Sequence, residues 1–218
     1  ARSVAVLAGG GNNGGDAYVV ARLAMQSEMP VTVYADNPSA RLSGDAEIAR
    51  QSYVATGGVS QPFSALDELP VPPDVVVDGL LGTGFKGALR APLSDLIRLV
   101  NGWQRPVIAI DLPSGLNADT GFVEAECVQA EYTVTFVALK FGLMTADGPD
   151  RVGKLLFAGL GIDEAFAKRF TPVRPCLPAR DMSWKTCARR WCRGSTPGSA
   201  TRSNSRGACT AMRFWRAC

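Results

Sequence analysis

Short apolar runs alternate with amphipathic segments along the first 160 residues of the chain. The runs are rich in Val, Ile and Leu, and several end at Gly or Asp, which is typical of buried strands in a parallel sheet. Strands are predicted at residues 3–8, 31–34, 75–78, 107–111, 133–139 and 154–157, and helices at residues 15–29, 42–56 and 89–101. Strands that alternate with helices need right-handed crossovers. The pattern therefore predicts a three-layer αβα sandwich with a Rossmann-like, mostly parallel sheet.

The charge distribution divides the chain near residue 180. Residues 1–180 carry 15 Lys+Arg and 19 Asp+Glu, whereas residues 181–218 carry 8 and 1, so the overall charge of +3 describes neither part. The second part also holds four of the six cysteines and contains no Val, Ile or Leu. Such a composition is typical of a GC-rich reading frame translated out of register. We therefore expect one domain at residues 1–180 and a non-native, disordered tail at 181–218, with a nucleic-acid-binding arm as the alternative.

Composition excludes several classes of protein. The chain has no histidine, which excludes a Ser-His-Asp triad and His-ligated zinc sites. No apolar run is long enough for a membrane span, and no signal segment opens the chain. Cysteine is sparse in residues 1–180, where Cys127 and Cys176 are the two examples, which suits a reducing compartment such as the cytoplasm. The tail cysteines lack the paired spacing of a zinc site.

Two glycine-rich segments follow predicted strands, and both fit the pattern G-x-G-x-x-G. The first is GGGNNGGD at residues 9–16, and the second is GTGFKG at residues 82–87. Glycines allow the backbone to approach a phosphate, whose charge is favoured at a helix N-terminus. Together the two segments predict a cradle for a pyrophosphate. The alternatives are plain glycine turns and, for Lys86, a solvated surface lysine.

Carboxylates stand at the ends of two predicted strands. Asp78 ends one apolar run and Asp111 ends the next, where a charge is costly unless it binds something. Because parallel strands end at one edge of the sheet, the two carboxylates are expected near each other, and they are the best acid–base candidates in a chain without histidine. The alternative for Asp111 is a turn-forming role. Thr83 and Ser114 have no evident base beside them, so nucleophilic serine chemistry is not expected.

Five segments, in chain order, resemble the NAD(P)H-hydrate epimerase family, also called the YjeF N-terminal domain. They are GNNGGD (11–16), VVAR (19–22), DGLLGTGFKG (78–87), IDLPSGLNADTG (110–121) and TVTFVALKFGL (133–143), and the resemblance covers about residues 4–163. The family interconverts the R and S epimers of reduced nicotinamide cofactors hydrated at C6, and a partner dehydratase specific for S restores the cofactor. This sequence differs from the family in having Ala17 where Gly is common, in lacking helices before the first strand, and in having no dehydratase-like segment after Arg180.

The resemblance implies a role for specific residues. Contacts to the hydrated dinucleotide are implied for Asn12, Asn13, Gly14, Gly15, Asp16, Gly82, Thr83, Gly84, Phe85, Lys86, Gly87, Ala88 and Asp111. Asn13, Asp78 and Ser114 would bind a potassium ion, and Asp111 would be the acid–base residue. Epimerisation through a planar iminium and through ring opening both stay open. The expected partners are hydrated NADH or NADPH and an S-specific dehydratase, with no nucleic acid or membrane, and a homodimer is left open.

Two other functions fit parts of the sequence. An NAD(P)-dependent oxidoreductase would use the first glycine segment, with Asp36 on a ribose about twenty residues later. That reading leaves the second glycine segment unexplained and supplies no histidine or Tyr-x-x-x-Lys acid. A catalytically inactive, protein-binding YjeF-like module is the other alternative. The presence of Asn13, Asp78, Asp111 and Ser114 favours catalysis.

Overall fold

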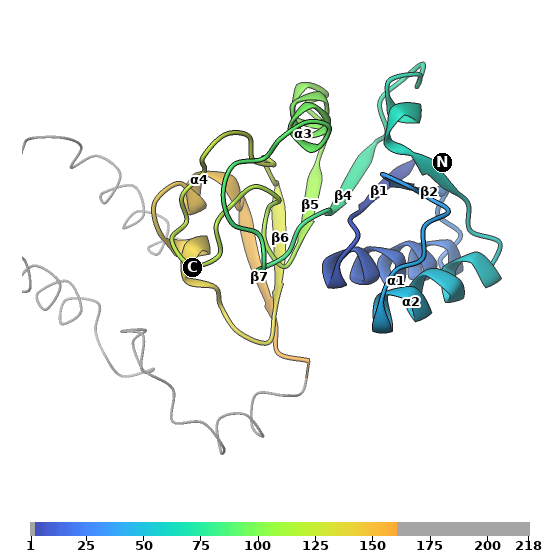
Figure 1. Ribbon diagram of the computed structural model, residues 1–218, viewed down its shortest axis with the longest axis horizontal. Helices are drawn as coiled ribbons and strands as arrows, with labels where there is room; N and C mark the ends of the chain where they lie inside the picture. Colours follow the sequence, from blue (N-terminus) through green and yellow to red (C-terminus); the bar gives the residue numbers. More distant parts are fainter. Residues whose placement is uncertain (1–2, 161–218) are drawn as a thin grey trace, which may run out of the picture. The chain divides into compact units, whose positions relative to one another are not determined.

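The computed structural model describes residues 3–160, which lie in the first of the two units into which the chain divides, Ala1–Leu160 (Figure 1). The predicted domain boundary at residue 180 lies outside the described residues. The same is true of the basic tail at 181–218, with its four cysteines and its predicted disorder. The fold below is therefore that of residues 3–160.

A seven-stranded sheet forms the centre of the fold, in the order β3-β2-β1-β4-β5-β6-β7. Every neighbouring pair is parallel. The strands are β1 (Val4–Ala8), β2 (Val31–Ala35), β3 (Ser60–Pro62), β4 (Val75–Gly79), β5 (Val107–Ile110), β6 (Tyr132–Phe136) and β7 (Lys154–Ala158). The prediction of a Rossmann-like parallel sheet is confirmed. The strand order reverses between β1 and β4, and in such sheets this switch point is where ligands bind.

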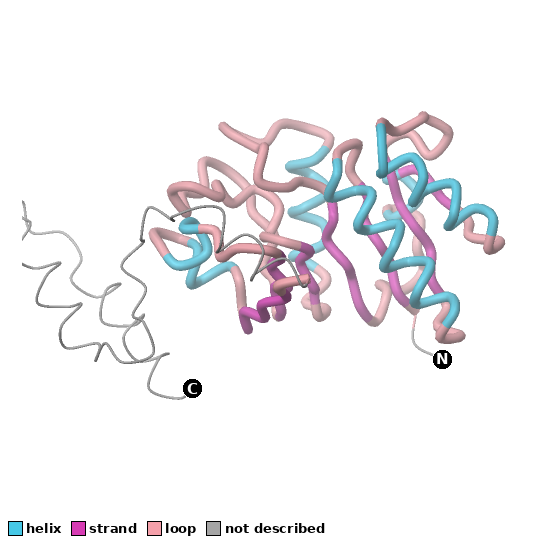
Figure 2. Tube along the Cα trace, turned by 90° about the horizontal axis from the view of Figure 1, so that it is seen from below, coloured by secondary structure: helices cyan, strands magenta, loops and turns pink. Residues whose placement is uncertain are grey.

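Helices cover both faces of the sheet (Figures 1 and 2). The helices are α1 (Asn12–Gln26), α2 (Gly44–Ala55), α3 (Leu93–Gly102) and α4 (Gly148–Arg151), and two 3₁₀ turns, η1 (Phe63–Leu66) and η2 (Phe141–Met144), complete the elements. Figure 1 shows α1 and α2 on one side of the strands and α3 on the other. No helix within residues 3–160 is both long and apolar enough to cross a bilayer.

Alternation along the strands builds the two main cores. In β1, Leu7 packs in the cluster that contains Ile97 of α3, whereas Val6 packs in the cluster that contains Ala17 and Ala21 of α1. Successive side chains of a strand point to opposite faces, so one short apolar run supplies both cores. A third cluster, built around Leu112, Leu116, Ala118, Cys127, Leu143 and Val152, supports the segments on either side of β6.

The boundaries of several elements differ from those predicted. The first helix begins at Asn12 rather than at residue 15, because residues 12–15 (NNGG) are themselves helical after the extended N-cap Gly11, and it ends at Gln26. The third helix begins at Leu93, four residues after the predicted start. Pro92 directly precedes it, and the ring of a proline disfavours the helical conformation in the residue before it, here Ala91. The short edge strand β3 has no apolar pattern and was not predicted.

Two predicted strands end early because the next residue has a positive φ. β5 stops at Ile110, and Asp111 has φ = 70°. β6 stops at Phe136, and Val137 has φ = 63°. Residues in this conformation cannot continue a strand. Both departures lie at the edge of the sheet where the candidate residues gather.

Candidate functional site

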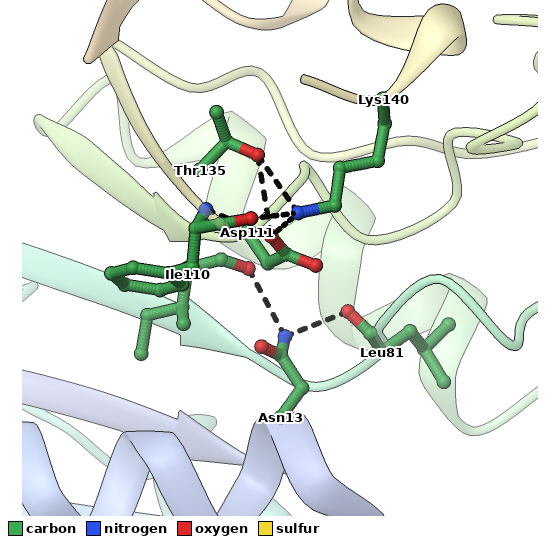
Figure 3. A network of polar contacts seen from close by, with 7 residues as sticks. Asn13, Leu81, Ile110, Asp111, Thr135 and Lys140 are labelled. Atoms are coloured by element: carbon green, nitrogen blue, oxygen red, sulfur yellow. Dashed lines mark hydrogen bonds and ion pairs between the residues drawn. The ribbon is translucent and has the colours of Figure 1, made fainter. Parts of the chain in front are cut away.

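The three segments singled out from the sequence meet at one edge of the sheet, as predicted. They are the start of α1, the segment that follows β4 and the segment that follows β5. The segment that follows β6 also lies at this edge (Figure 3). Asn13 contributes from the first of these segments and Asp111 from the third. The site is therefore built at the carboxyl ends of β1, β4, β5 and β6, where ligands bind in open parallel sheets.

Asp78 is the buried centre of the first hydrogen-bond network. Its side chain is fully buried. Oδ1 accepts hydrogen bonds from Ser114 Oγ (2.6 Å) and from the Leu80 N–H (3.2 Å), and Oδ2 accepts one from the Ser114 N–H (2.8 Å). Ser114 Oγ in turn accepts a hydrogen bond from the Leu81 N–H (3.0 Å). Burial raises the pKa of Asp78, and the hydrogen bonds from Ser114 and Leu80 oppose that rise.

Asn13 connects α1 to this network. Its Nδ2 donates hydrogen bonds to the carbonyl oxygens of Leu81 (2.7 Å) and Ile110 (3.2 Å), as Figure 3 shows. The side chain is buried, and its Oδ1 accepts no hydrogen bond from the described residues. The start of α1, the end of β4 and the end of β5 are thereby fixed together through one amide.

The oxygen donors in this network suit potassium by their chemistry. Asn13, Asp78 and Ser114 offer amide, carboxylate and hydroxyl oxygens, the ligands that hard cations prefer. Asp78 has no Lys or Arg partner among the described residues, although it is a carboxylate buried in a low-dielectric interior. Residues 3–160 contain no cluster of three or more His, Cys, Asp or Glu side chains that could hold a metal ion. The oxygen atoms of Asn13, Asp78 and Ser114 are compatible with a hard cation such as potassium.

Asp111 lies at the centre of a tight backbone turn directly after β5. The Leu112 N–H donates to the Ile110 carbonyl (2.9 Å) across Asp111, whose φ is 70°, so that Asp111 is the central residue of a tight γ-turn. The Asp111 N–H donates to the Val134 carbonyl (2.8 Å). This form of γ-turn is rare and strained, and such strain is found where the surrounding structure fixes a functional group.

The carboxylate of Asp111 is bound through one oxygen. Its Oδ1 accepts hydrogen bonds from Thr135 Oγ1 (3.2 Å) and the Phe136 N–H (3.2 Å), and it forms an ion pair with Lys140 Nζ (Figure 3). Lys140 Nζ also donates to Thr135 Oγ1 (3.1 Å) and the Phe136 carbonyl (2.8 Å). The Lys140 and Asp111 side chains are 16% and 17% exposed. Oδ2 of Asp111 accepts no hydrogen bond from residues 3–160.

Lys140 and Thr135 were missed as individual site residues by sequence reasoning. Thr133 and Thr135 are polar residues at alternate, fully buried positions of β6. Two threonines at alternate positions of a predicted strand are a signal that the sequence carries. Lys140 lies four residues beyond the end of β6, within the family-like segment 133–143, but neither hydrophobic periodicity nor a strand end singles it out there.

Asp16 is a second carboxylate near Asp111. It lies in the first turns of α1 and remains solvent-accessible. Partial burial raises the pKa of Asp16, and the negative charge of Asp111 raises it further. Asp36, the residue that an oxidoreductase would use, is exposed directly after β2.

The first glycine segment is mostly the first turn of α1 rather than a loop. Gly14 and Gly15 are buried, and a Cβ on Gly14 would lie 1.8 Å from the Gly9 carbonyl oxygen. A Cβ on Gly15 would lie 2.7 Å from Cα of Ala46 in α2. These two glycines allow close packing, and their predicted contact with a dinucleotide remains a prediction. The turn has no side-chain cap, so its first N–H groups stay free for an anion.

The second glycine segment is more exposed. Thr83, Gly84, Gly87 and Ala88 are exposed, whereas Phe85 packs against the core. Lys86, for which a contact to the hydrated dinucleotide is predicted, forms an ion pair with Asp119 (3.4 Å), and both side chains are largely exposed. Lys86 is therefore already paired, though weakly, as surface ion pairs are.

Comparison with known proteins gives the family. The model of the family "YjeF-related protein N-terminus" matches residues 1–142. The chain is 45% identical over 161 residues to the bifunctional NAD(P)H-hydrate repair enzyme of Leishmania infantum, covering 73% of this chain and 29% of that protein. It is 41% identical over 174 residues to the bifunctional NAD(P)H-hydrate repair enzyme Nnr of Escherichia coli K12, covering 80% and 33%. The chain thus spans about a third of the length of these relatives.

A solved structure shows the same fold. The crystal structure of yeast ynu0, YNL200c, superposes with a TM-score of 0.56 at 23% identity, covering 64% of this chain and 59% of the yeast chain. The sheet order, the position of the glycine-rich and carboxylate segments at one sheet edge and the family match over residues 1–142 agree with one another. The chain belongs to the YjeF-related protein N-terminus family.

Proposed function

We propose that the chain catalyses the interconversion of the R and S epimers of NADH or NADPH hydrated at C6 of the nicotinamide ring. The family and the names of the relatives support this activity. The observation that carries it is the carboxylate of Asp111, which is fixed through one oxygen and has its second oxygen free at the ligand-binding edge of the sheet.

The dinucleotide would bind across the switch point of the sheet. Its pyrophosphate would lie at the N-terminus of α1, where uncapped N–H groups and the helix dipole favour an anion. The exposed segment from Gly82 to Ala88 would cover the other side of the pyrophosphate. The nicotinamide would then lie toward β5 and β6, beside Asp111. This arrangement uses both glycine segments, whereas an oxidoreductase needs the first alone.

Asn13, Asp78 and Ser114 would bind the potassium ion. A bound cation supplies positive charge that offsets the buried Asp78 carboxylate and the phosphates of the substrate. We expect potassium to raise the melting temperature of the wild-type chain more than an equal concentration of choline chloride, because a ligand that binds the native state stabilises it. Asp78→Asn should remove that difference. An equal response to both salts would contradict the site.

Asp111 would exchange one proton with the C6 oxygen of the substrate. In the iminium route, the carboxyl group gives its proton to the C6 hydroxyl, which leaves as water, and then takes a proton from the water that adds to the other face. In the ring-opening route, the carboxylate takes the hydroxyl proton and passes it to N1 as the C6–N1 bond breaks and C6 becomes an aldehyde carbon. Closure on the other face of that carbon returns the proton from N1 through Asp111 to the C6 oxygen. Both routes need a carboxyl oxygen that is free to exchange a proton.

The assay starts from the purified R epimer and follows the S epimer by chromatography. Asp111→Asn should lower the rate by at least about 10²-fold, the usual contribution of an acid–base residue, while dinucleotide binding is largely kept. Asp95→Asn, at an exposed site on α3, is the matched control and should keep full activity. A fully active Asp111→Asn variant would refute the assignment.

An S-specific NAD(P)H-hydrate dehydratase would consume the product. The relatives are named as bifunctional repair enzymes, which supports this coupling. Adding such a dehydratase to the R epimer should restore the reduced cofactor when the chain is present. The cytoplasm is the expected compartment, which the free thiol of Cys127 fits. Light scattering would decide the open question of a homodimer.

A further inference from the structure

We propose that Lys140 is a positioning residue, which holds Asp111 so that Oδ2 alone exchanges the proton with the substrate. This inference rests on the proposed epimerase function and adds a residue to its site. Three observations support it. Lys140 forms an ion pair with Asp111, and all three N–H bonds of its ammonium group have acceptors. The backbone has a positive φ at Asp111 and at Val137, on either side of the pair.

The ammonium group of Lys140 has no hydrogen-bond donor left for a ligand. An ammonium carries three N–H bonds. In Lys140 they are directed to Asp111 Oδ1, Thr135 Oγ1 (3.1 Å) and the Phe136 carbonyl (2.8 Å) (Figure 3). Lys140 would have to give up one of these bonds in order to contact the substrate. It therefore acts through Asp111.

The same contacts divide the two oxygens of Asp111 between two tasks. Oδ1 accepts three hydrogen bonds, from Thr135, Phe136 and Lys140, which fix the plane and the direction of the carboxylate. Oδ2 accepts none from the described residues. A carboxylate that is anchored through one oxygen presents the other in one defined direction, which is what a proton transfer over hydrogen-bond distance requires.

The backbone is bent twice to make this pair. Besides the γ-turn at Asp111, the Ala138 N–H donates to the Phe136 carbonyl (2.6 Å) across Val137, whose φ is 63°. A β-branched residue at positive φ is a strained outlier. The two turns lie at the ends of adjacent strands, β5 and β6, and the second reverses the chain so that Lys140 returns to the end of its own strand. Strain of this kind persists where a functional group must be held.

A purely structural role explains the pair poorly. A largely buried ion pair adds little to stability, because the desolvation of both charges offsets their attraction, and an apolar pair of similar volume often serves as well. The negative charge of Asp111 also raises the pKa of Asp16, so two like charges act on each other at this edge. Lys140 places a positive charge directly against Asp111.

The kinetic test replaces Lys140 by a neutral side chain of similar length. Lys140→Met should lower kcat by about 10²-fold and change KM by less than about 3-fold, because the free donors that bind the substrate lie elsewhere and the misplaced carboxylate affects the chemical step. Lys154→Met, at an exposed position of β7, is the matched control and should keep full activity. An unchanged kcat, or a loss confined to KM, would overturn the proposal.

A second test measures the chemical reactivity of Lys140. It requires neither an activity assay nor a folded Lys140 variant. Reductive methylation of the wild-type chain, mapped by mass spectrometry, should modify Lys140 at least about 10-fold more slowly than the exposed Lys86, because its ammonium is held inside the network. Asp111→Asn should bring the rate at Lys140 close to that at Lys86. Equal rates in the wild type would overturn the pairing. Slow modification in a wild type that shows no epimerase activity would support the pairing and reject the proposed function.

Discussion

Replacing Ser114 by alanine tests the network around Asp78 most directly. The hydroxyl makes two hydrogen bonds, one to Asp78 Oδ1 (2.6 Å) and one from the Leu81 N–H (3.0 Å). A hydrogen bond to a charged group contributes roughly 1.5–3 kcal/mol, and an N–H left without a partner costs about 1 kcal/mol or more. We therefore expect Ser114→Ala to lower the free energy of unfolding by roughly 2–4 kcal/mol.

Urea titration followed by circular dichroism measures this loss. The expected result is a lower midpoint with an unchanged slope, which reports a change in stability rather than in the denatured state. Potassium is omitted from the buffer, so that loss of a bound ion does not add to the difference. Ser52→Ala is the control: its hydroxyl donates to the Ile48 carbonyl (2.8 Å) within exposed turns of α2, and its removal should change stability by less than about 0.5 kcal/mol. Equal effects of the two substitutions would refute the reasoning.

The loss of stability in Ser114→Ala should also depend on pH. Burial raises the pKa of Asp78 above its value in the unfolded chain. The stability that follows from this shift is present below the unfolded pKa and is lost as the pH rises through the native pKa. Ser114→Ala removes the side-chain hydrogen bond that favours the ionised form of Asp78, while the backbone hydrogen bond from residue 114 remains, so the pKa of Asp78 rises further. The destabilisation should therefore be larger at pH 7 than at pH 4.5, and a larger loss at pH 4.5 would contradict the assigned cause.

Three further substitutions and one labelling reaction test other parts of the fold and the site. Gly9→Ala should destabilise the chain by about 3 kcal/mol or prevent folding, because its Cβ would lie 1.8 Å from the Leu80 carbonyl oxygen. Gly10→Ala, with nothing within 4 Å, should change the urea midpoint little. Burial raises the pKa of the Cys127 thiol to about 12, so iodoacetamide at pH 8 should label Cys127 in urea and leave it unlabelled in the folded chain, as read by mass spectrometry. Thr135→Val should lower kcat by about 10-fold, since Lys140 and Phe136 still hold Oδ1 of Asp111; an unchanged kcat would contradict a role for its hydroxyl.

The sheet and the central carboxylates could be predicted because their signals are local. Apolar runs identify β1, β4 and β5, and parallel topology alone brings the residues after them to one edge. Asp78 and Asp111 were found for that reason. Asp78 shows its importance in the sequence as a charged residue within an apolar run, and the structure confirms its burial.

The rest of the site depends on contacts that no local pattern describes. The NNGG residues 12–15 are poor helix formers, and they are helical in the structure, where Gly15 packs against Ala46 of α2. Asn13 donates to the carbonyls of Leu81, after β4, and of Ile110, at the end of β5. The position of Lys140 depends on positive φ at Val137, a conformation that a β-branched residue adopts under tertiary constraint. β3 exists through its pairing with β2.

The contact between Gly9 and Leu80 determines which parts of the site can respond to a ligand. The backbones of Gly9 and Leu80 are so close that a Cβ on Gly9 would not fit between them. The segments after β1 and β4 should therefore move together as one rigid unit. Adaptation to a bound molecule is then left to the exposed stretch that begins at Thr83, which has few partners to break. Binding would accordingly lose entropy mainly in this short stretch, while Asp111, the proposed acid–base residue, and its anchors are in place before the ligand arrives.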